Sequence, residues 1–323
     1  MKALITGGAG FIGSHLAERL LDRGDSVVAV DDLSTGRREN LSAAQGNPSF
    51  RFVRADVRDR SILTPLVDGC DVVFHLAAAV GVQLIVDQPV HTLETNIHGS
   101  EVVLSLASQF GRKVILASTS EVYGKNTKVP FAEDDDTLLG STIYTRWSYA
   151  ASKMVDEFLA LAYHDQYHLP VIICRFFNTV GPRQSGAYGM VVPRFVQAAL
   201  AGDPLTIYGS GLQSRCFCHV ADIVEALVKL VDCHEATGKV INVGTSESVT
   251  IAELAERVIE LTDSDSPVRN ISYQQAYGRP FDDMLVRQPD LTRIKSLIDY
   301  QPTYNLTQTL QTVIDYEKGR MHP

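Results

Sequence analysis

The chain has 323 residues, of which 45% are hydrophobic and 21% charged, and its formal net charge is −9 at pH 7. This length suits one large α/β domain, or two closely joined ones, with a sizeable core. The acidic balance and the lack of any Lys/Arg run argue against a nucleic-acid partner. The apolar stretches are short and strand-like, which argues against a membrane span. No signal-peptide pattern follows Met1, so we expect a cytoplasmic protein.

The five cysteines are an odd number and are scattered through apparent core elements, at Cys70, Cys174, Cys216, Cys218 and Cys233. This usage favours reduced, buried thiols over a disulfide framework. Cys216 and Cys218 precede His219, but no second matching pair completes a metal clip. We therefore expect no metal site.

The first motif is a glycine-rich turn. Lys2–Thr6 is a short apolar run, and apolar residues continue at helical spacing from the turn to Gly24. Strand, turn and helix in this order place the glycines where they allow a tight turn and the close approach of a pyrophosphate to backbone N–H groups. The turn predicts dinucleotide contacts from Gly7, Gly10, Phe11, Ile12 and Gly13.

The next predicted strand, Ser26–Val30, ends in two carboxylates, Asp31 and Asp32. A carboxylate at this distance after the glycines accepts hydrogen bonds from the adenosine ribose hydroxyls and would repel a 2′-phosphate. NAD is therefore favoured over NADP. Arg37 and Arg38 follow closely, and we interpret them as part of a solvated loop.

Further strands alternate with helices. Phe50–Arg54 leads to Asp56 and Val57, which could hold the adenine edge, although Asp56 could equally cap the next helix. The strand over 71–76 ends in small residues that would let a cofactor approach, so we expect contacts from Leu76, Ala77 and Ala78. A long helix over Pro89–Phe110 carries Asn96, another predicted cofactor contact.

The predicted fifth strand, Lys113–Ser118, leads directly into Thr119 and Glu121. The alternation predicts a doubly wound parallel (Rossmann) sheet with ligands at the carboxyl ends of its strands.

The polar, acidic segment 125–147 is long enough to predict a lid or surface excursion. The helix that follows carries Tyr149 and Lys153, which share a face because they lie four residues apart. Val171–Phe176 is the sixth strand, and Asn178 follows it.

Shorter elements fill the rest of the chain, predicted over Val192–Ala201, Leu205–Tyr208, Arg215–His219, Ala221–Val231, Val240–Val243 and Thr250–Leu261. Thr250 and Glu253 have capping-box spacing.

We expect an NAD-binding domain over 1–176 plus about 215–245, and a smaller interleaved substrate domain over 177–214 and 246–323. Spare apolar residues on the helices over 89–110 and after Tyr149 predict a homodimer.

Taken together, the motifs resemble the extended short-chain dehydrogenase/reductase family, in its nucleotide-sugar branch. The resemblance covers essentially the whole chain. It rests on the stretches 6–13, 75–78, 118–124, 175–178, 181–183 and 208–211, with Asp31, Tyr149, Lys153 and Arg215. It implies a tightly held NAD that oxidises a sugar hydroxyl of a nucleotide-diphosphate sugar.

The resemblance also implies roles for individual residues. Tyr149 would take the proton of the sugar 4-hydroxyl while hydride leaves to NAD, with Thr119 on the same oxygen and Lys153 on the nicotinamide ribose. A neighbouring ammonium would lower the pKa of the phenol from about 10 by roughly 1–3 units. For the diphosphate sugar, the predicted contacts are Thr119, Glu121, Asn178, Arg194, Tyr208, Arg215 and Arg279.

A 4-keto sugar can be decarboxylated, dehydrated or reduced on its other face, so three reactions remain open. Glu121 is expected to discriminate among them. The form of the stretch 118–124 resembles the UDP-glucuronate decarboxylases. Ser120 stands where thymidine-sugar dehydratases carry an aspartate, and simple epimerases carry small or neutral residues at Glu121. The stretch 80–85 departs from the proline-rich loop of the decarboxylases that make UDP-xylose. A 4-epimerase is the second hypothesis, a dehydratase the third, and a non-catalytic NAD sensor a hypothesis of another class.

Overall fold

The computed structural model describes residues 1–188, 190–278 and 282–321. Seven strands form one parallel sheet in the order β11-β6-β5-β4-β1-β2-β3. The chain winds from β1 outwards to β3 and then returns to the other side of β1, so the sheet is doubly wound as predicted. The strands are β1 (Lys2–Thr6), β2 (Ser26–Asp31), β3 (Phe50–Arg54), β4 (Val72–His75), β5 (Lys113–Thr119), β6 (Val171–Phe176) and β11 (Lys239–Val243).

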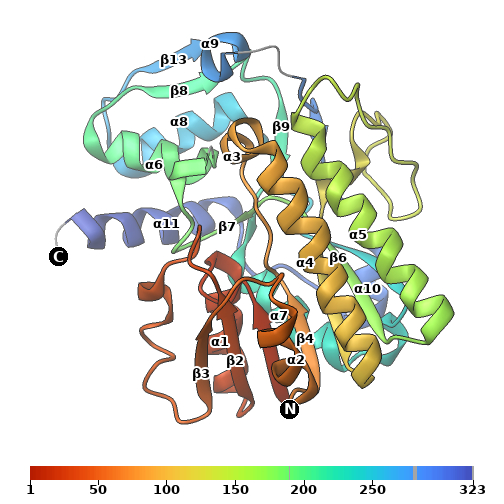
Figure 1. The fold of residues 1–323 in the computed structure, drawn as a ribbon. Helices are drawn as coiled ribbons and strands as arrows, with labels where there is room; N and C mark the ends of the chain where they lie inside the picture. Colours follow the sequence, from red (N-terminus) through yellow and green to blue (C-terminus); the bar gives the residue numbers. More distant parts are fainter. Residues whose placement is uncertain (189, 279–281, 322–323) are drawn as a thin grey trace.

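Helices cover both faces of this sheet, which explains why its strands read as continuous apolar runs. Successive side chains of a strand point to opposite faces. Along β1, Ala3 and Ile5 enter one apolar cluster, whereas Leu4 enters the other. The first cluster contains α1 (Phe11–Asp22), α7 (Val220–Asp232) and α10 (Thr292–Ile298), and the second contains α2 (Arg60–Asp68), α4 (Pro89–Phe110) and α5 (Arg146–Tyr167). Figure 1 shows α4 and α5 side by side along the molecule.

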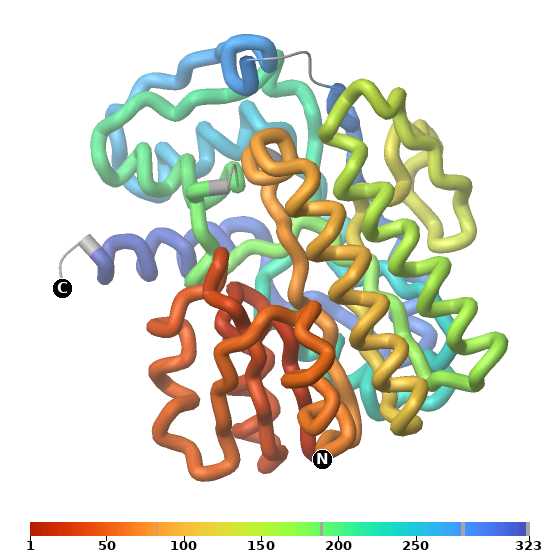
Figure 2. Tube along the Cα trace, in the orientation of Figure 1, coloured from red at the N-terminus to blue at the C-terminus, as the bar shows by residue number. Residues whose placement is uncertain are grey.

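A third apolar cluster lies beyond the carboxyl ends of the strands. It is built by α6 (Val191–Ala201), α8 (Ile251–Thr262) and α11 (Leu306–Met321). In Figure 2, α6, α8 and the small sheet of β8 and β13, drawn green to blue, lie at one end of the molecule, above the red N-terminal strands. The strands here are β8 (Leu205–Tyr208), β9 (Ser214–Cys216), β12 (Ser248–Thr250), β13 (Val268–Ile271) and β14 (Val286–Arg287). The division into two domains stays a prediction.

The remaining elements are short. They are α3 (Val82–Asp87), α9 (Tyr273–Tyr277), β7 (Thr179–Val180), β10 (Cys218–His219), η1 (Arg38–Leu41), η2 (Ser120–Tyr123), η3 (Gly186–Tyr188) and η4 (His234–Ala236). The capping box of Thr250 and Glu253 is present at the start of α8. No helix within the described ranges is both long and apolar enough to cross a membrane.

Two local predictions were wrong, and one alternative left open by the sequence does not hold. The expected strand over 215–219 is broken at Phe217 into β9 and β10, which join different sheets. The helix of Tyr149 begins earlier, at Arg146. Asp56 does not cap α2, because the N-cap is Asp59, whose carboxylate accepts the backbone N–H groups of the first turn. Asp56 is instead paired with Arg58 at 2.6 Å.

The segment 125–147 is only partly a surface excursion. Phe131 is fully buried and stacks on Tyr123, and Glu133 is also buried. The reason is Asn242 at the end of β11. Its backbone N–H donates to Glu133 Oε1 at 2.9 Å, and its side-chain amide donates to the Phe131 carbonyl at 2.9 Å. An acidic side chain buried with a hydrogen-bond partner cannot be distinguished in sequence from one in solvent.

Candidate active site

A cavity of about 450 Å³ lies at the carboxyl ends of the sheet strands, under the C-terminal cluster. Open parallel sheets bind ligands at this edge, where the strand order reverses. The cavity is lined by nearly all of the predicted site residues, namely Gly7, Gly10, Phe11, Ile12, Gly13, Asp31, Asp32, Asp56, Val57, Leu76, Ala77, Ala78, Thr119, Glu121, Tyr149, Lys153, Asn178, Arg194, Tyr208 and Arg215. Arg279 lies outside the described residues.

The glycine turn leaves space that side chains would fill. A Cβ on Gly13 would lie 2.2 Å from the Gly7 carbonyl oxygen, and one on Gly7 would lie 2.8 Å from the Ala77 nitrogen. Gly7 also has a φ of +71°, which favours glycine. Gly10 is the N-cap of α1 and no side chain caps that helix. The uncapped N–H groups, which open on a cavity, fit a pyrophosphate.

Asp31 is placed to bind hydroxyl groups. Its two carboxylate oxygens accept the backbone N–H groups of Ala9 at 3.0 Å and Leu33 at 2.8 Å. A carboxylate has about four acceptor sites, so Asp31 keeps capacity for another donor. Burial raises the pKa of Asp31, and the backbone hydrogen bonds oppose this. The neighbouring Arg37 side chain is exposed, as expected for a solvated loop.

Asn96 differs from the other predicted cofactor contacts because it lies behind the cavity wall. Its Oδ1 accepts the Ala79 N–H at 2.8 Å, and its Nδ2 donates to Ser152 Oγ at 3.1 Å. It therefore connects the turn after β4 to α5. We interpret Asn96 as a support for that turn.

Tyr149 and Lys153 lie one turn apart on α5, as the spacing predicted, and both are buried. The expected lowering of the phenol pKa is not found. Burial raises the pKa of Tyr149, and the charges of Glu121 and Asp156 raise it further, against a hydrogen bond with Thr119. Burial is the largest cause, and the neighbouring ammonium of Lys153 is itself paired with a carboxylate, because its Nζ lies 2.7 Å from Asp156 Oδ2.

Glu121 is held between two arginines. Arg146 Nη1 donates to Glu121 Oε2 at 2.6 Å, and Arg287 Nη1 donates to Oε1 at 3.2 Å. Burial alone would raise the pKa of Glu121, but the two guanidinium groups outweigh it and the pKa is lowered. Glu121 is therefore ionised at neutral pH and stays so in mild acid. Its partners come from the start of α5 and from β14, far apart in the sequence.

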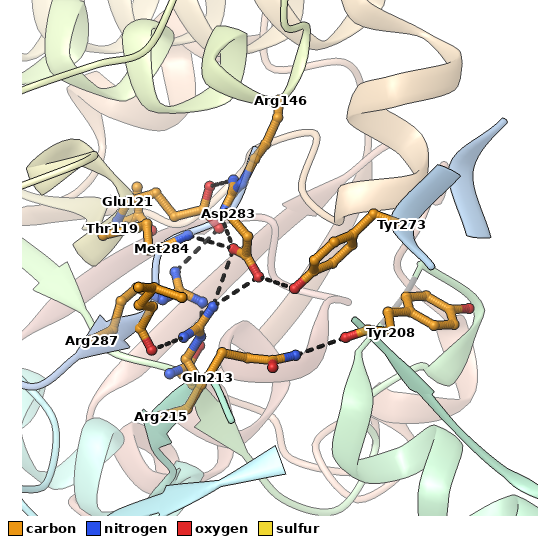
Figure 3. Close-up of polar contacts among 12 residues, drawn as sticks. Thr119, Glu121, Arg146, Tyr208, Gln213, Arg215, Tyr273, Asp283, Met284 and Arg287 are labelled. Carbon is orange, nitrogen blue, oxygen red and sulfur yellow. Dashed lines mark hydrogen bonds and ion pairs between the residues drawn. The ribbon is translucent and has the colours of Figure 1, made fainter. Parts of the chain in front are cut away.

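A second carboxylate, Asp283, completes this cluster (Figure 3). It accepts Arg215 Nη2 at 3.1 Å and the Tyr273 hydroxyl at 2.9 Å, and it lies 3.4 Å from Arg146 Nη2. Burial raises the pKa of Asp283, but the surrounding arginines lower it overall. Two carboxylates and three arginines thus share one buried site, and the charges sum to +1.

The remaining predicted substrate contacts lie around this cluster. Asn178 Oδ1 accepts Arg287 Nη2 at 2.8 Å. The Arg194 guanidinium lies over the Tyr208 ring, 4.0 Å from its centroid, and donates to the Thr206 carbonyl at 3.0 Å. Arg194 and Tyr208 therefore form one flat wall of the cavity.

Sequence reasoning did not single out Arg146, Asp283 and Arg287 as site residues. Arg146 lies one turn before Tyr149, so helical spacing could have indicated it. The stretch around Asp283 and Arg287 carries no motif, and only the fold brings it to Glu121. Groups of His, Cys, Asp and Glu that could hold a metal ion are absent from the described residues.

Comparisons with known proteins find relatives that match nearly the whole chain. The UDP-N-acetyl-alpha-D-glucosaminuronate decarboxylase of Bacillus cytotoxicus is 42% identical over 98% of this chain and 97% of its own. The UDP-glucuronic acid decarboxylase 2 of Arabidopsis thaliana is 38% identical over 97% of this chain and 67% of its own. A Bacillus cereus UDP-glucuronic acid 4-epimerase, solved with a fluorinated UDP-glucuronic acid and NAD, is 29% identical, with a TM-score of 0.88 over 99% of this chain and 100% of its own. The model of the GDP-mannose 4,6 dehydratase family matches residues 4–313, and the chain belongs to this family.

Proposed function

We propose that this chain is an NAD-dependent decarboxylase of a nucleotide-linked uronate. The favoured reaction converts UDP-glucuronate to UDP-xylose or to the UDP-4-keto-pentose through a 4-keto intermediate. The observation that carries the proposal is the ionised Glu121 between Arg146 and Arg287, in the same cavity as Tyr149 and Lys153. The names of the curated relatives support the same reaction type.

The cavity residues fit NAD. The glycine turn and the open N-terminus of α1 would hold its pyrophosphate, and Asp31 its adenosine ribose. Asp56 and Val57 would lie at the adenine, and Leu76, Ala77 and Ala78 along the path to the nicotinamide. Bound NAD supplies an acceptor for the hydride of sugar carbon 4 and brings a positive ring charge next to Tyr149.

Tyr149 takes the proton of the sugar 4-hydroxyl as the ketone forms, and Thr119 donates a hydrogen bond to the same oxygen. The carbon-6 carboxylate is then β to a ketone. The bond between carbons 5 and 6 can break, because its electron pair passes to the ketone oxygen as an enolate. Tyr149, now protonated, donates a hydrogen bond to that oxygen and stabilises the charge. Carbon 5 then takes up one proton from water. Return of the hydride to carbon 4, with the proton of Tyr149 going to the oxygen, gives UDP-xylose, whereas release before that return gives the UDP-4-keto-pentose and leaves the cofactor reduced.

Glu121 has a defined part in this step. Two arginines alone would bind the substrate carboxylate strongly, and CO₂ leaves as a neutral molecule. Binding the carboxylate more tightly than the transition state raises the barrier. Glu121 offsets the positive charge of Arg146 and Arg287, so the carboxylate is held without being over-stabilised.

Arginines further out would bind the diphosphate. Arg215 and Arg194 line the cavity, and guanidinium forks suit paired phosphate oxygens. Asn178 and Tyr208 complete this side, with Tyr208 at the nucleotide base. Arg215 is paired with Asp283, so a phosphate would compete with that carboxylate for the same donors.

A 4-epimerase acting on UDP-glucuronate is the second candidate. It is favoured by the solved epimerase relative and by the same Tyr149 and Lys153 pair, which both reactions need. The two differ in the fate of the carbon-6 carboxylate, which an epimerase keeps.

We also propose that the protein works in the cytoplasm, because all five cysteines are free thiols.

The protein should release CO₂ from UDP-glucuronate. UDP-N-acetylglucosaminuronate, which shares the carbon-6 carboxylate and the 4-hydroxyl, is the natural second substrate to assay, with UDP-glucose as the control that has no carboxylate. Tyr149→Phe keeps the ring but removes the acid/base hydroxyl, and we expect CO₂ release to fall by about 10²–10⁴-fold. Products are read by NMR. Galacturonate products without CO₂ would favour the epimerase, and unchanged sugars would overturn both.

Glu121→Gln should separate binding from reaction. The amide keeps the size of the side chain but leaves Arg146 and Arg287 with excess positive charge. We expect KM for UDP-glucuronate to stay equal or fall, while kcat for CO₂ release falls by about 100-fold. Glu225→Gln, which breaks a partly exposed ion pair with Arg19, is the matched control. Decarboxylation at the wild-type rate in Glu121→Gln would remove the role given to this residue.

The helix pair α4 and α5 supports a homodimer. Val90, Val155 and Phe158 expose 66%, 42% and 68% of their surface on these two helices. We expect light scattering to give twice the 35.4 kDa of one chain. Phe158→Glu should reduce this mass to that of a monomer. Leu212→Glu, an equally exposed position elsewhere, should leave it unchanged. A monomeric wild-type protein would contradict the proposed dimer.

A further inference from the structure

The proposed mechanism makes no use of Asp156, although it lies against a residue central to that mechanism. Asp156 follows Lys153 by three residues on α5, and its Oδ2 lies 2.7 Å from the ammonium. The two side chains are 1% and 3% exposed. Exposed pairs at this spacing contribute little, but a buried ammonium needs a partner in place because its burial is costly.

The other groups around this pair carry no charge that could replace Asp156. Ser100 of α4 faces Asp156, and its hydroxyl also lies 3.1 Å from His75 Nε2. His75 Nδ1 lies 2.8 Å from the Thr6 hydroxyl. Burial and the charge of Lys153 lower the pKa of His75 to about 3, so the imidazole is neutral. Glu157, the next residue on α5, is engaged by Arg175 at 2.7 Å. Asp156 is therefore the carboxylate paired with the ammonium of Lys153. Burial raises the pKa of Asp156, and the charge and hydrogen bond of Lys153 oppose this.

The pairing of Lys153 with Asp156 also affects the phenol of Tyr149, which lies one turn before Lys153 on the same helix face. An ammonium beside a phenol favours the phenolate, whereas a carboxylate opposes it. Tyr149 is also faced by Glu121 from η2, which opposes the phenolate, and by Arg287 from β14, which favours it. Burial and the net of these charges raise the pKa of the phenol, and Asp156 is one of the groups that does so.

We propose that Asp156 is a positioning residue for the reaction, which fixes the ammonium of Lys153 between α4 and α5 and offsets its charge beside Tyr149. The inference rests on the proposed function of Tyr149 as acid and base. It assigns Asp156 two separable effects. The carboxylate oxygen holds Lys153 by a hydrogen bond, and the negative charge keeps the proton on Tyr149 until the site is loaded.

Two substitutions separate these effects. Asp156→Asn keeps an oxygen that can accept from Lys153 but removes the charge, whereas Asp156→Ala removes both. In Asp156→Asn the acid limb of the kcat/KM profile should move to lower pH, by about 0.5–1 unit. Asp156→Ala should show the same shift and, in addition, about a 10-fold loss of kcat. Asp165→Asn removes an exposed carboxylate from the same helix and should shift nothing.

A measurement without substrate makes the test independent of the proposed reaction. The carbon-13 resonance of the Tyr149 ring, assigned by its loss in Tyr149→Phe, reports the protonation of the phenol directly. In wild-type protein from which any bound nucleotide has been removed, it should titrate above about pH 10, the ordinary value. In Asp156→Asn it should titrate lower.

Three outcomes would change the role assigned to Asp156 or to the protein. A wild-type Tyr149 that titrates below its ordinary value would overturn the proposal even if the variants fail to fold. Folded Asp156 variants with an unmoved Tyr149 resonance and pH profile, and only a lower melting temperature, would reduce Asp156 to a structural residue. A shifted resonance in a protein that releases no CO₂ would retain the charge balance and reject the proposed function instead.

Discussion

The candidate site depends on the carboxylate of Glu121, which holds two arginines that the chain supplies from distant places. Arg146 opens the helix that carries Tyr149 and Lys153, and Arg287 lies on a short strand of the C-terminal portion. Because these three side chains are only 3–11% exposed, removal of one leaves a poorly solvated, uncompensated charge. The same contacts that set the charge of the site therefore also fix the C-terminal portion over the end of the sheet.

The two ends of the cavity offer a ligand different kinds of interaction. At the glycine turn, the proposed cofactor would find space and free backbone donors, since a single Cβ at Gly13 would strike the Gly7 carbonyl. At the other end, Asp283 and Glu121 offset two of the three positive charges of Arg146, Arg215 and Arg287, and the proposed anionic substrate would meet the remaining one. A dinucleotide at the glycine turn, with an anionic sugar beside it at the arginines, would match both ends of the cavity. Under the proposed function, the cofactor end would serve several nucleotide-sugar reactions, and a few side chains beside Tyr149 would select the chemistry.

Much of this could be predicted from sequence, because the signals are local. The glycine turn, the carboxylates at the end of β2 and the pair Tyr149 and Lys153 each lie within a few consecutive residues. The burial of Phe131 could not be predicted, since it depends on Asn242 more than a hundred residues later. Arg287 and Asp283 were missed for the same reason. Asp156 lay within reach of helical spacing, but only burial distinguishes an ion pair that matters from a surface pair of the same spacing.

In the proposed decarboxylation, oxidation at carbon 4 precedes the loss of carbon 6. The most direct measurement is a single turnover of the NAD-loaded protein with UDP-glucuronate carrying either hydrogen or deuterium at carbon 4. The near-ultraviolet absorbance of NADH and the release of CO₂ are followed together. NADH absorbance should rise before CO₂ appears, and deuterium should slow this rise. Release of CO₂ at an unchanged rate with no NADH absorbance would contradict it.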